Sequence, residues 1–187
     1  MEPWMWIVIA IVAIVVVAAL AWAAWNGRRR KHLQEGFGPE YDRAVSEAPS
    51  RREAEAELRE RQERRAAFDI RPLAPEDRDR YAASWQTAQA RFVDDPDGAI
   101  GEADSLIQSV MRDRGYPVDD FDQRAADLSV DHPDVVEHYR EGHAIATRTA
   151  DGDGDTESLR QAMVHYRALF VELLETDEAE DRVEARS

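Results

Sequence analysis

Histidines are the first residues to test for chemistry, because they serve as metal ligands and as general bases. The chain has five of them and no cysteine, which excludes zinc–thiolate sites, iron–sulfur clusters, disulfides and thiol catalysis. His138 and His143 are five positions apart, so on a helix they diverge by roughly 140° and make a poor metal pair. His165 lies beside Tyr166 in an apolar stretch, where we favour a histidine at the edge of the core over a metal ligand.

Helical bundles that hold two iron ions need the motif Glu-x-x-His on two helices. No histidine of this chain has a glutamate three positions before it; those positions hold Arg29, Ser129, Val135, Arg140 and Ala162. The Gly-x-Ser-x-Gly, P-loop and His-Glu-x-x-His motifs are also missing from the sequence. We therefore predict that the chain is not an enzyme and has no catalytic, cofactor-binding or metal-binding residue.

Asp151 to Asp155 alternate with glycine in the manner of an EF-hand loop. The sixth and twelfth positions of such a loop need Gly and Glu, but this chain has Thr156 and Ala162 there. We interpret the segment as a turn that caps the last helix.

Asp119, Asp120 and Asp122 offer paired carboxylates for acid–base chemistry. In so acidic a chain a solvated helix start is favoured over a site. A membrane-associated enzyme or metal-binding module that combines these aspartates with His138 and His165 stays open as an alternative function.

The charge balance of the chain bears on its partners. The 187 residues include 24 basic and 39 acidic side chains, for a formal net charge of -15. The residues before Leu33 sum to +3 and the remainder to -18. Because nucleic-acid binding relies on basic side chains that neutralise phosphates, we predict no nucleic-acid partner.

Residues 4–25 contain no charged side chain. A helix of this length spans roughly 33 Å, close to the ~30 Å hydrocarbon thickness of a bilayer. Tryptophans favour the membrane–water interface, and four of them flank the segment at its two ends: Trp4, Trp6, Trp22 and Trp25. We predict a transmembrane helix at residues 4–25.

A basic juxtamembrane segment, residues 26–32, follows the apolar one. The positive-inside rule then places residues 1–3 outside and the C-terminal domain in the cytoplasm of a single-pass cell-membrane protein. The lipid bilayer is the predicted partner, and anionic headgroups are a further option. The predicted interface residues here are Arg28, Arg29, Arg30 and Lys31.

A cleaved signal peptide is the alternative to an anchor. Two stretches, Ala19 to Ala21 and Ala21 to Ala23, fit a small-x-small cleavage pattern. No basic residue precedes the apolar run, however, and the run is longer than a usual signal core of about 7–15 residues. We favour the anchor, and an extracytoplasmic or secreted helical protein stays open.

Residues 33–72 have the composition of a charged helical linker. Gly36 to Pro39 form a hinge, and Ser50 to Glu53 match a capping box ahead of Glu/Arg pairs at i,i+4. These pairs predict a helix that starts after Ser50, and Leu58 is its single large apolar residue. We therefore expect a solvated spacer without a coiled-coil seam.

Residues 73–176 repeat apolar side chains at helical spacing between Pro and Gly breaks. They predict an all-α fold in which an acidic, compact bundle of four to five helices follows the linker. Gly142 lies on an apolar stripe and predicts a close approach of two helices. Residues 177–187 are predicted to be a disordered tail.

The sequence resembles a family of uncharacterised, membrane-anchored proteins of high-GC actinobacteria, whose members often have the labels hypothetical or secreted. The stretches that show the resemblance are FGPEYDR (37–43), RREAEAELRERQERR (51–65), ARFVDDP (90–96), VMRDRGYPVDDFDQRAADLSVDHPDVVEHYR (110–140) and DTESLRQAMVHYRALFVELL (155–174). The resemblance implies a bacterial source and brings no activity, cofactor or catalytic residue.

The sequence combines a transmembrane helix, a charged helical linker and a helical bundle without a catalytic motif. We therefore predict a membrane-tethered protein-interaction or scaffold module. Aromatic candidates for an exposed partner surface are Tyr116, Phe121 and Tyr139. The oligomeric state stays open, because the apolar segment lacks Gly-x-x-x-Gly but is rich in alanine.

Overall fold

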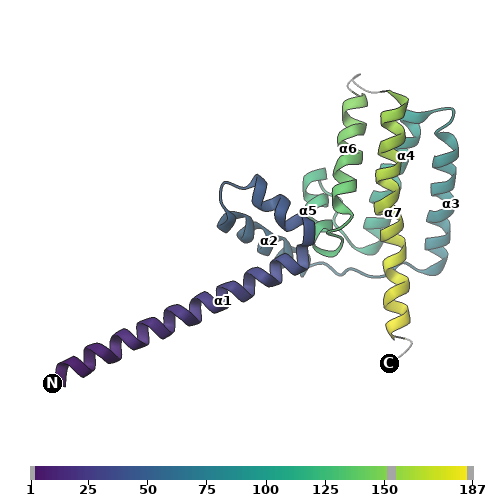
Figure 1. Cartoon of the computed structure of the whole chain (residues 1–187). Helices are drawn as coiled ribbons and strands as arrows, with labels where there is room; N and C mark the ends of the chain where they lie inside the picture. Colours follow the sequence, from purple (N-terminus) through teal and green to yellow (C-terminus); the bar gives the residue numbers. More distant parts are fainter. Residues whose placement is uncertain (1–2, 151–154, 185–187) are drawn as a thin grey trace. The chain divides into compact units, whose positions relative to one another are not determined.

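The computed structural model describes residues 3–150 and 155–184, and in these residues it has seven α-helices and no strand (Figure 1). The all-α prediction is confirmed. The helices are α1 (Pro3–Glu47), α2 (Arg51–Arg65), α3 (Pro75–Arg91), α4 (Pro96–Arg114), α5 (Phe121–Asp131), α6 (Val136–Ala150) and α7 (Thr156–Glu184). Two compact units divide the chain, Met1–Arg59 and Glu60–Ser187, and their boundary falls inside α2.

Helix α1 contains the apolar segment, residues 4–25. The large side chains of this segment that the structure describes are exposed, among them Trp4, Ile14, Leu20, Trp22 and Trp25. The Trp6 side chain lies outside the described residues. Taking only the described residues, no helix is both long and apolar enough to cross a membrane. The transmembrane assignment therefore stays a prediction.

The predicted hinge corresponds to a bend of α1 at Gly38, where φ is 45° and ψ is -124°, and Pro39 follows at the start of the next helical segment. Beyond it the capping box is formed, with the Glu53 amide donating to Ser50 Oγ at 3.3 Å. The Tyr41 hydroxyl of α1 donates to Glu55 of α2 at 2.9 Å. These contacts join α1 to the part of α2 that belongs to the N-terminal unit.

The interpretation of residues 33–72 as a solvated spacer is wrong in part. Side chains of both helices are buried, namely Leu33, Phe37, Tyr41, Ala44, Ala54 and Leu58. In α2 the burial falls on one large and one small apolar residue four positions apart, Leu58 and Ala54. Because Ala54 is small, a pattern based on large apolar residues does not detect this stripe.

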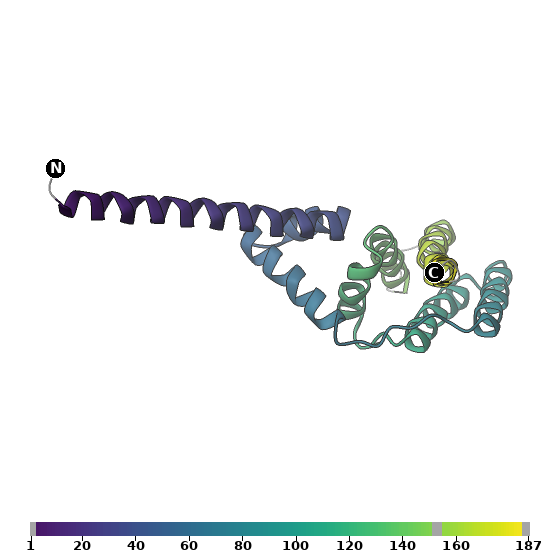
Figure 2. The same ribbon diagram turned by 90° about the horizontal axis from the view of Figure 1, so that it is seen from below.

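The C-terminal unit is a helical bundle, as predicted, and its described residues form the end of α2 and five complete helices, α3 to α7. Helices α3, α4, α7 and α6 lie side by side in that order, and α5 packs against α6 (Figures 1 and 2). Fully buried side chains fill the space between them, among them Ile107, Val110, Met111, Leu128, Tyr139, Tyr166, Leu169 and Leu173. Helix α7 extends to Glu184, past the predicted end near residue 176.

Helix boundaries in this unit follow the breaks seen in the sequence. Asp95 caps α4 by accepting from the Gly98 amide at 3.0 Å, and Gly115 ends the same helix with a positive φ of 97°. Asp120 caps α5 by accepting from the Gln123 amide at 3.1 Å. Asp155 caps α7 through the Ser158 amide at 2.8 Å.

Candidate functional site

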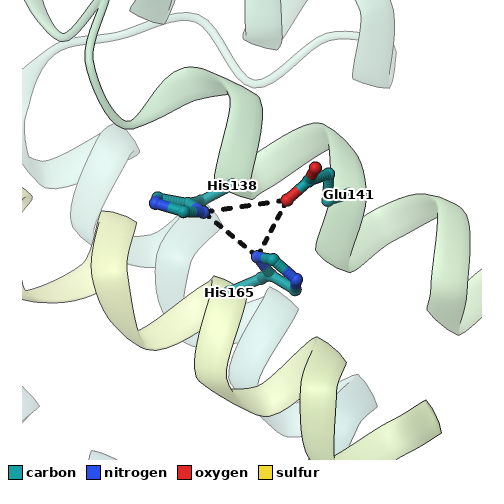
Figure 3. A group of neighbouring side chains, drawn as sticks. All are labelled: His138, Glu141 and His165. Carbon is teal, nitrogen blue, oxygen red and sulfur yellow. Dashed lines mark hydrogen bonds and ion pairs between the residues drawn. The ribbon is translucent and has the colours of Figure 1, made fainter.

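Three side chains that can bind a metal ion meet between α6 and α7 (Figure 3). His138 and Glu141 lie one helical turn apart on α6, and His165 lies on α7. The Nδ1 atoms of the two histidines are 3.1 Å apart. Glu141 Oε2 is 3.1 Å from His165 Nδ1 and 3.8 Å from His138 Nδ1. We call these three residues the His–Glu cluster.

Gly142 explains how the two helices come close enough to form the cluster. A Cβ atom at this position would lie 2.9 Å from Cδ1 of the buried Tyr166 ring and 3.3 Å from the Cβ of His165. The predicted close approach at Gly142 is confirmed. It places His165 against the turn of α6 that holds His138 and Glu141.

The cluster lies at the surface of an acidic unit. The exposed fractions of the side chains are 46% for His138, 48% for Glu141 and 24% for His165, which leaves room for water beside them. The unit from Glu60 to Ser187 has 16 basic and 31 acidic side chains. A net negative field of this kind raises the local concentration of cations.

The other candidate residues of the sequence that the structure describes do not join the cluster. His143 stacks on Phe121 with ring centroids 3.6 Å apart, as its predicted divergence from His138 requires. Asp119 pairs with Arg64 at 3.2 Å, and Asp120 caps α5. Residues 151–154 lie outside the described residues. The structure therefore brings His138 and His165 together but gives Asp119 and Asp120 other partners, so the grouping of the histidines with these aspartates is wrong.

Glu141 was not identified from the sequence, and neither were His138 and Glu141 as a possible pair of metal ligands. A search for glutamate three positions before each histidine overlooks the reverse order, His-x-x-Glu, which His138 and Glu141 form. On a helix both orders place the two side chains on one face. The contribution of His165 depends on the register between α6 and α7, for which Gly142 is the sole signal in the sequence.

The aromatic candidates for a partner surface are part of the core. Tyr116 and Tyr139 are buried, and Phe121 is half-buried and packs on Tyr139 with ring centroids 4.9 Å apart. The Tyr116 hydroxyl donates to Asp131 at 2.5 Å. Burial and then the Asp131 charge raise the pKa of Tyr116, so its hydroxyl stays protonated as a donor. The prediction that these aromatics are exposed is wrong.

A second candidate feature is a basic pocket within the N-terminal unit. Its cavity of about 570 Å³ is lined by Trp22, Asn26, Arg29, Arg30 and Leu33 of α1 and by Arg51, Arg52, Glu55 and Arg59 of α2. Three of the predicted interface residues, Trp22, Arg29 and Arg30, thus line one pocket. The arginines of α2 were not predicted to take part.

Three further interface residues, Trp25, Arg28 and Lys31, are sequence neighbours of the pocket residues in α1. The Arg29 guanidinium stacks over the Trp25 ring at 4.2 Å from its centroid. Arg28 is exposed, and Lys31 pairs with Glu35 at 3.6 Å. Arg30 Nε lies 3.9 Å from Glu55 of α2, which links the basic segment to the second helix.

Comparison of the chain with protein-family models, with curated proteins and with solved structures finds no match. The resemblance to actinobacterial membrane-anchored proteins therefore stays a prediction.

Proposed function

We propose that this chain is a single-pass membrane protein that tethers an acidic helical module to the cytoplasmic face of a bilayer, where the module binds another protein. The observation that carries the proposal is residues 4–25, an uncharged helical stretch whose described large side chains are exposed. So extended an apolar surface needs an apolar partner. A bilayer matches both its length and its flanking tryptophans.

The basic pocket supports the proposal that the bilayer surface lies near the end of the apolar segment. Its lining begins at Trp22, in the last turn of the apolar segment, and includes five arginines against a single glutamate, Glu55. Basic side chains at a membrane surface gain about 1 kcal/mol each from anionic lipids. The same charges favour an orientation in which the helical module faces the cytoplasm.

The protein-binding role of the module rests on its charge. The unit from Glu60 to Ser187 holds the whole net charge of -15, because the preceding residues contain eight basic and eight acidic side chains. Over the described part of this unit, the exposed large apolar side chains are Val93 and Val164. A surface of this kind favours a partner with a basic face, whose binding is sensitive to salt.

Two reporter fusions test the topology. Green fluorescent protein, which matures in the cytoplasm, and alkaline phosphatase, which needs the oxidising exterior, are each joined after Ser187. We expect fluorescence without phosphatase activity. Phosphatase activity without fluorescence would instead support the extracytoplasmic alternative.

Crosslinking in intact membranes tests the interaction. The full chain should capture a basic protein at low ionic strength and lose it near 0.5 M salt, where the Debye length falls to roughly 4–5 Å. A chain in which the exposed residues Asp79 and Asp94 are replaced by lysine serves as the comparison. Capture that is absent, or equal for both chains, would contradict a charge-based partner.

A further inference from the structure

We propose that His138, Glu141 and His165 bind one divalent first-row transition-metal ion, of which Zn²⁺ is the type case, with water completing its coordination. The proposal goes beyond the proposed function and does not depend on the membrane tether. It rests on the positions of three donor atoms from two helices.

The distances between the donors match those around a bound metal ion. Donors at about 2.0–2.2 Å from a tetrahedral zinc ion lie about 3.3–3.6 Å from each other. The three distances in the cluster are 3.1, 3.1 and 3.8 Å. A circle through these three atoms has a radius of about 2.0 Å, so one ion slightly above their plane reaches all three at ordinary bond lengths.

The direction of the donors also favours a cation over a hydrogen-bonded group. Both histidines present Nδ1 toward the Glu141 carboxylate, and their Nε2 atoms point away from it (Figure 3). A proton on His165 Nδ1 can form a hydrogen bond with the Glu141 carboxylate or with His138 Nδ1, but it cannot point toward both acceptors with good geometry. One metal ion engages all three lone pairs at once.

The chain holds the three ligands in place before any ion binds. His138 and Glu141 share one turn of α6, and the close approach at Gly142 fixes His165 across from them. Tyr166, next to His165, is fully buried, so the backbone that supports this ligand belongs to the core. A bound ion would therefore connect α6 to α7 with little reorganisation.

The donor set selects the class of metal. Two imidazole nitrogens and one carboxylate suit zinc, cobalt, nickel and iron(II), whereas calcium and magnesium prefer oxygen ligands alone. Three protein ligands with exposed fractions of 24% to 48% leave one side of the ion to water. Coordination by three residues plus water is the open arrangement found in zinc sites that exchange ligands.

Cobalt titration of the full chain in detergent tests the proposal directly. The protein is purified without a polyhistidine tag, and the visible absorption of Co²⁺ reports its coordination. We expect one Co²⁺ per chain with the intense bands of a four- or five-coordinate ion, lost when Zn²⁺ is added. Zinc at about a hundredfold excess over its Kd should raise the Tm by roughly 5–10 °C.

Matched variants assign the binding to the cluster. H138A, E141Q and H165A should each weaken Zn²⁺ binding at least about tenfold, whereas H32A, at an exposed histidine of the other unit, should leave it unchanged. His138 and Glu141 are the more exposed ligands, so H138A and E141Q keep the test valid if H165A fails to fold. Absent saturable binding, or binding that survives both H138A and E141Q, would overturn the proposal.

Discussion

Gly142 sets the distance between α6 and α7. A methyl group there meets carbon atoms of the buried Tyr166 ring at 2.9 and 3.0 Å. We expect G142A to lower the free energy of unfolding by about 1–2 kcal/mol, because overpacking outweighs the gain in helix propensity. Urea unfolding of the full chain in detergent measures this change.

Gly101 provides the control for Gly142. It lies in α4 and is exposed, and a methyl group added there would have no atom within 4 Å beyond its own helix backbone and chain neighbours. G101A should therefore stabilise the chain by about 0.5–1 kcal/mol. Equal effects of the two substitutions would show that the helices are not in tight contact at Gly142.

His132 gives the bundle a dependence on pH. It is buried at the end of α5, and burial, followed by the Arg114 charge, lowers its pKa below the ordinary 6.5. The unfolded chain then binds the proton more readily than the folded chain. The stabilising contribution of neutral His132 is complete above about pH 6.5 and is lost as the pH falls below it.

The slope of unfolding free energy against pH measures this effect. As the pH falls from 6.5 to 5, we expect His132 to lower the free energy of unfolding by at most about 1.4 kcal/mol per pH unit. H132Q should remove that part of the slope, and H32Q, at an exposed histidine, should retain it. A slope that is the same in H132Q and the unaltered chain would show that other groups cause it.

At the residue scale the sequence allowed part of the site to be predicted. The divergence of His138 from His143 follows from helix geometry alone, and the structure confirms it. The meeting of His138 with His165 does not follow, because the two are 27 positions apart and their contact depends on how α6 and α7 pack. Glu141 is different, since the His-x-x-Glu spacing was present in the sequence and a wider search would find it.

At the scale of elements, the segment that follows α2 is fixed to the end of α4. The Arg71 amide donates to the Arg114 carbonyl at 2.9 Å, and Arg71 Nε donates to the Asp113 carbonyl at 3.2 Å. Gly115, with its φ of 97°, lies directly against this segment. A Cβ atom there would be 2.3 Å from the Asp69 carbonyl oxygen.

We therefore expect G115A to destabilise the bundle by about 2–4 kcal/mol, the sum of left-handed backbone strain and the displacement of Asp69. Because the clash is with a backbone oxygen, adding D69G should not restore stability. Thermal unfolding of the three chains checks this. A loss below about 1 kcal/mol would mean that the segment moves aside without cost.

Helix positions in the bundle could be predicted because Pro, Asp and Gly mark their ends. The capping by Asp95 and Asp120 and the stop at Gly115 are local effects that short stretches of sequence determine. The burial of Leu58 and Ala54 in α2 could not be predicted in the same way. A helix with so few apolar residues is buried only because other parts of the fold cover it.

At the scale of the whole molecule, the two units differ in charge. The N-terminal unit is neutral overall and concentrates its arginines around one pocket, whereas the C-terminal unit carries a net charge of -15. This division fits one unit that meets anionic lipid and another that attracts cations or basic proteins. Composition allowed both tendencies to be predicted, but the sharing of the pocket between α1 and α2 required the folded structure.

The central claim is that residues 4–25 stay in the chain as a membrane anchor. Intact-mass analysis of the protein from carbonate-washed membranes tests it most directly. When the 187 residues are expressed, we predict that the washed membranes retain them uncut at 21.3 kDa, with Trp4 and Trp6 still present. A protein released into the soluble or external fraction, with its first residue near Trp22 or beyond, would contradict the account.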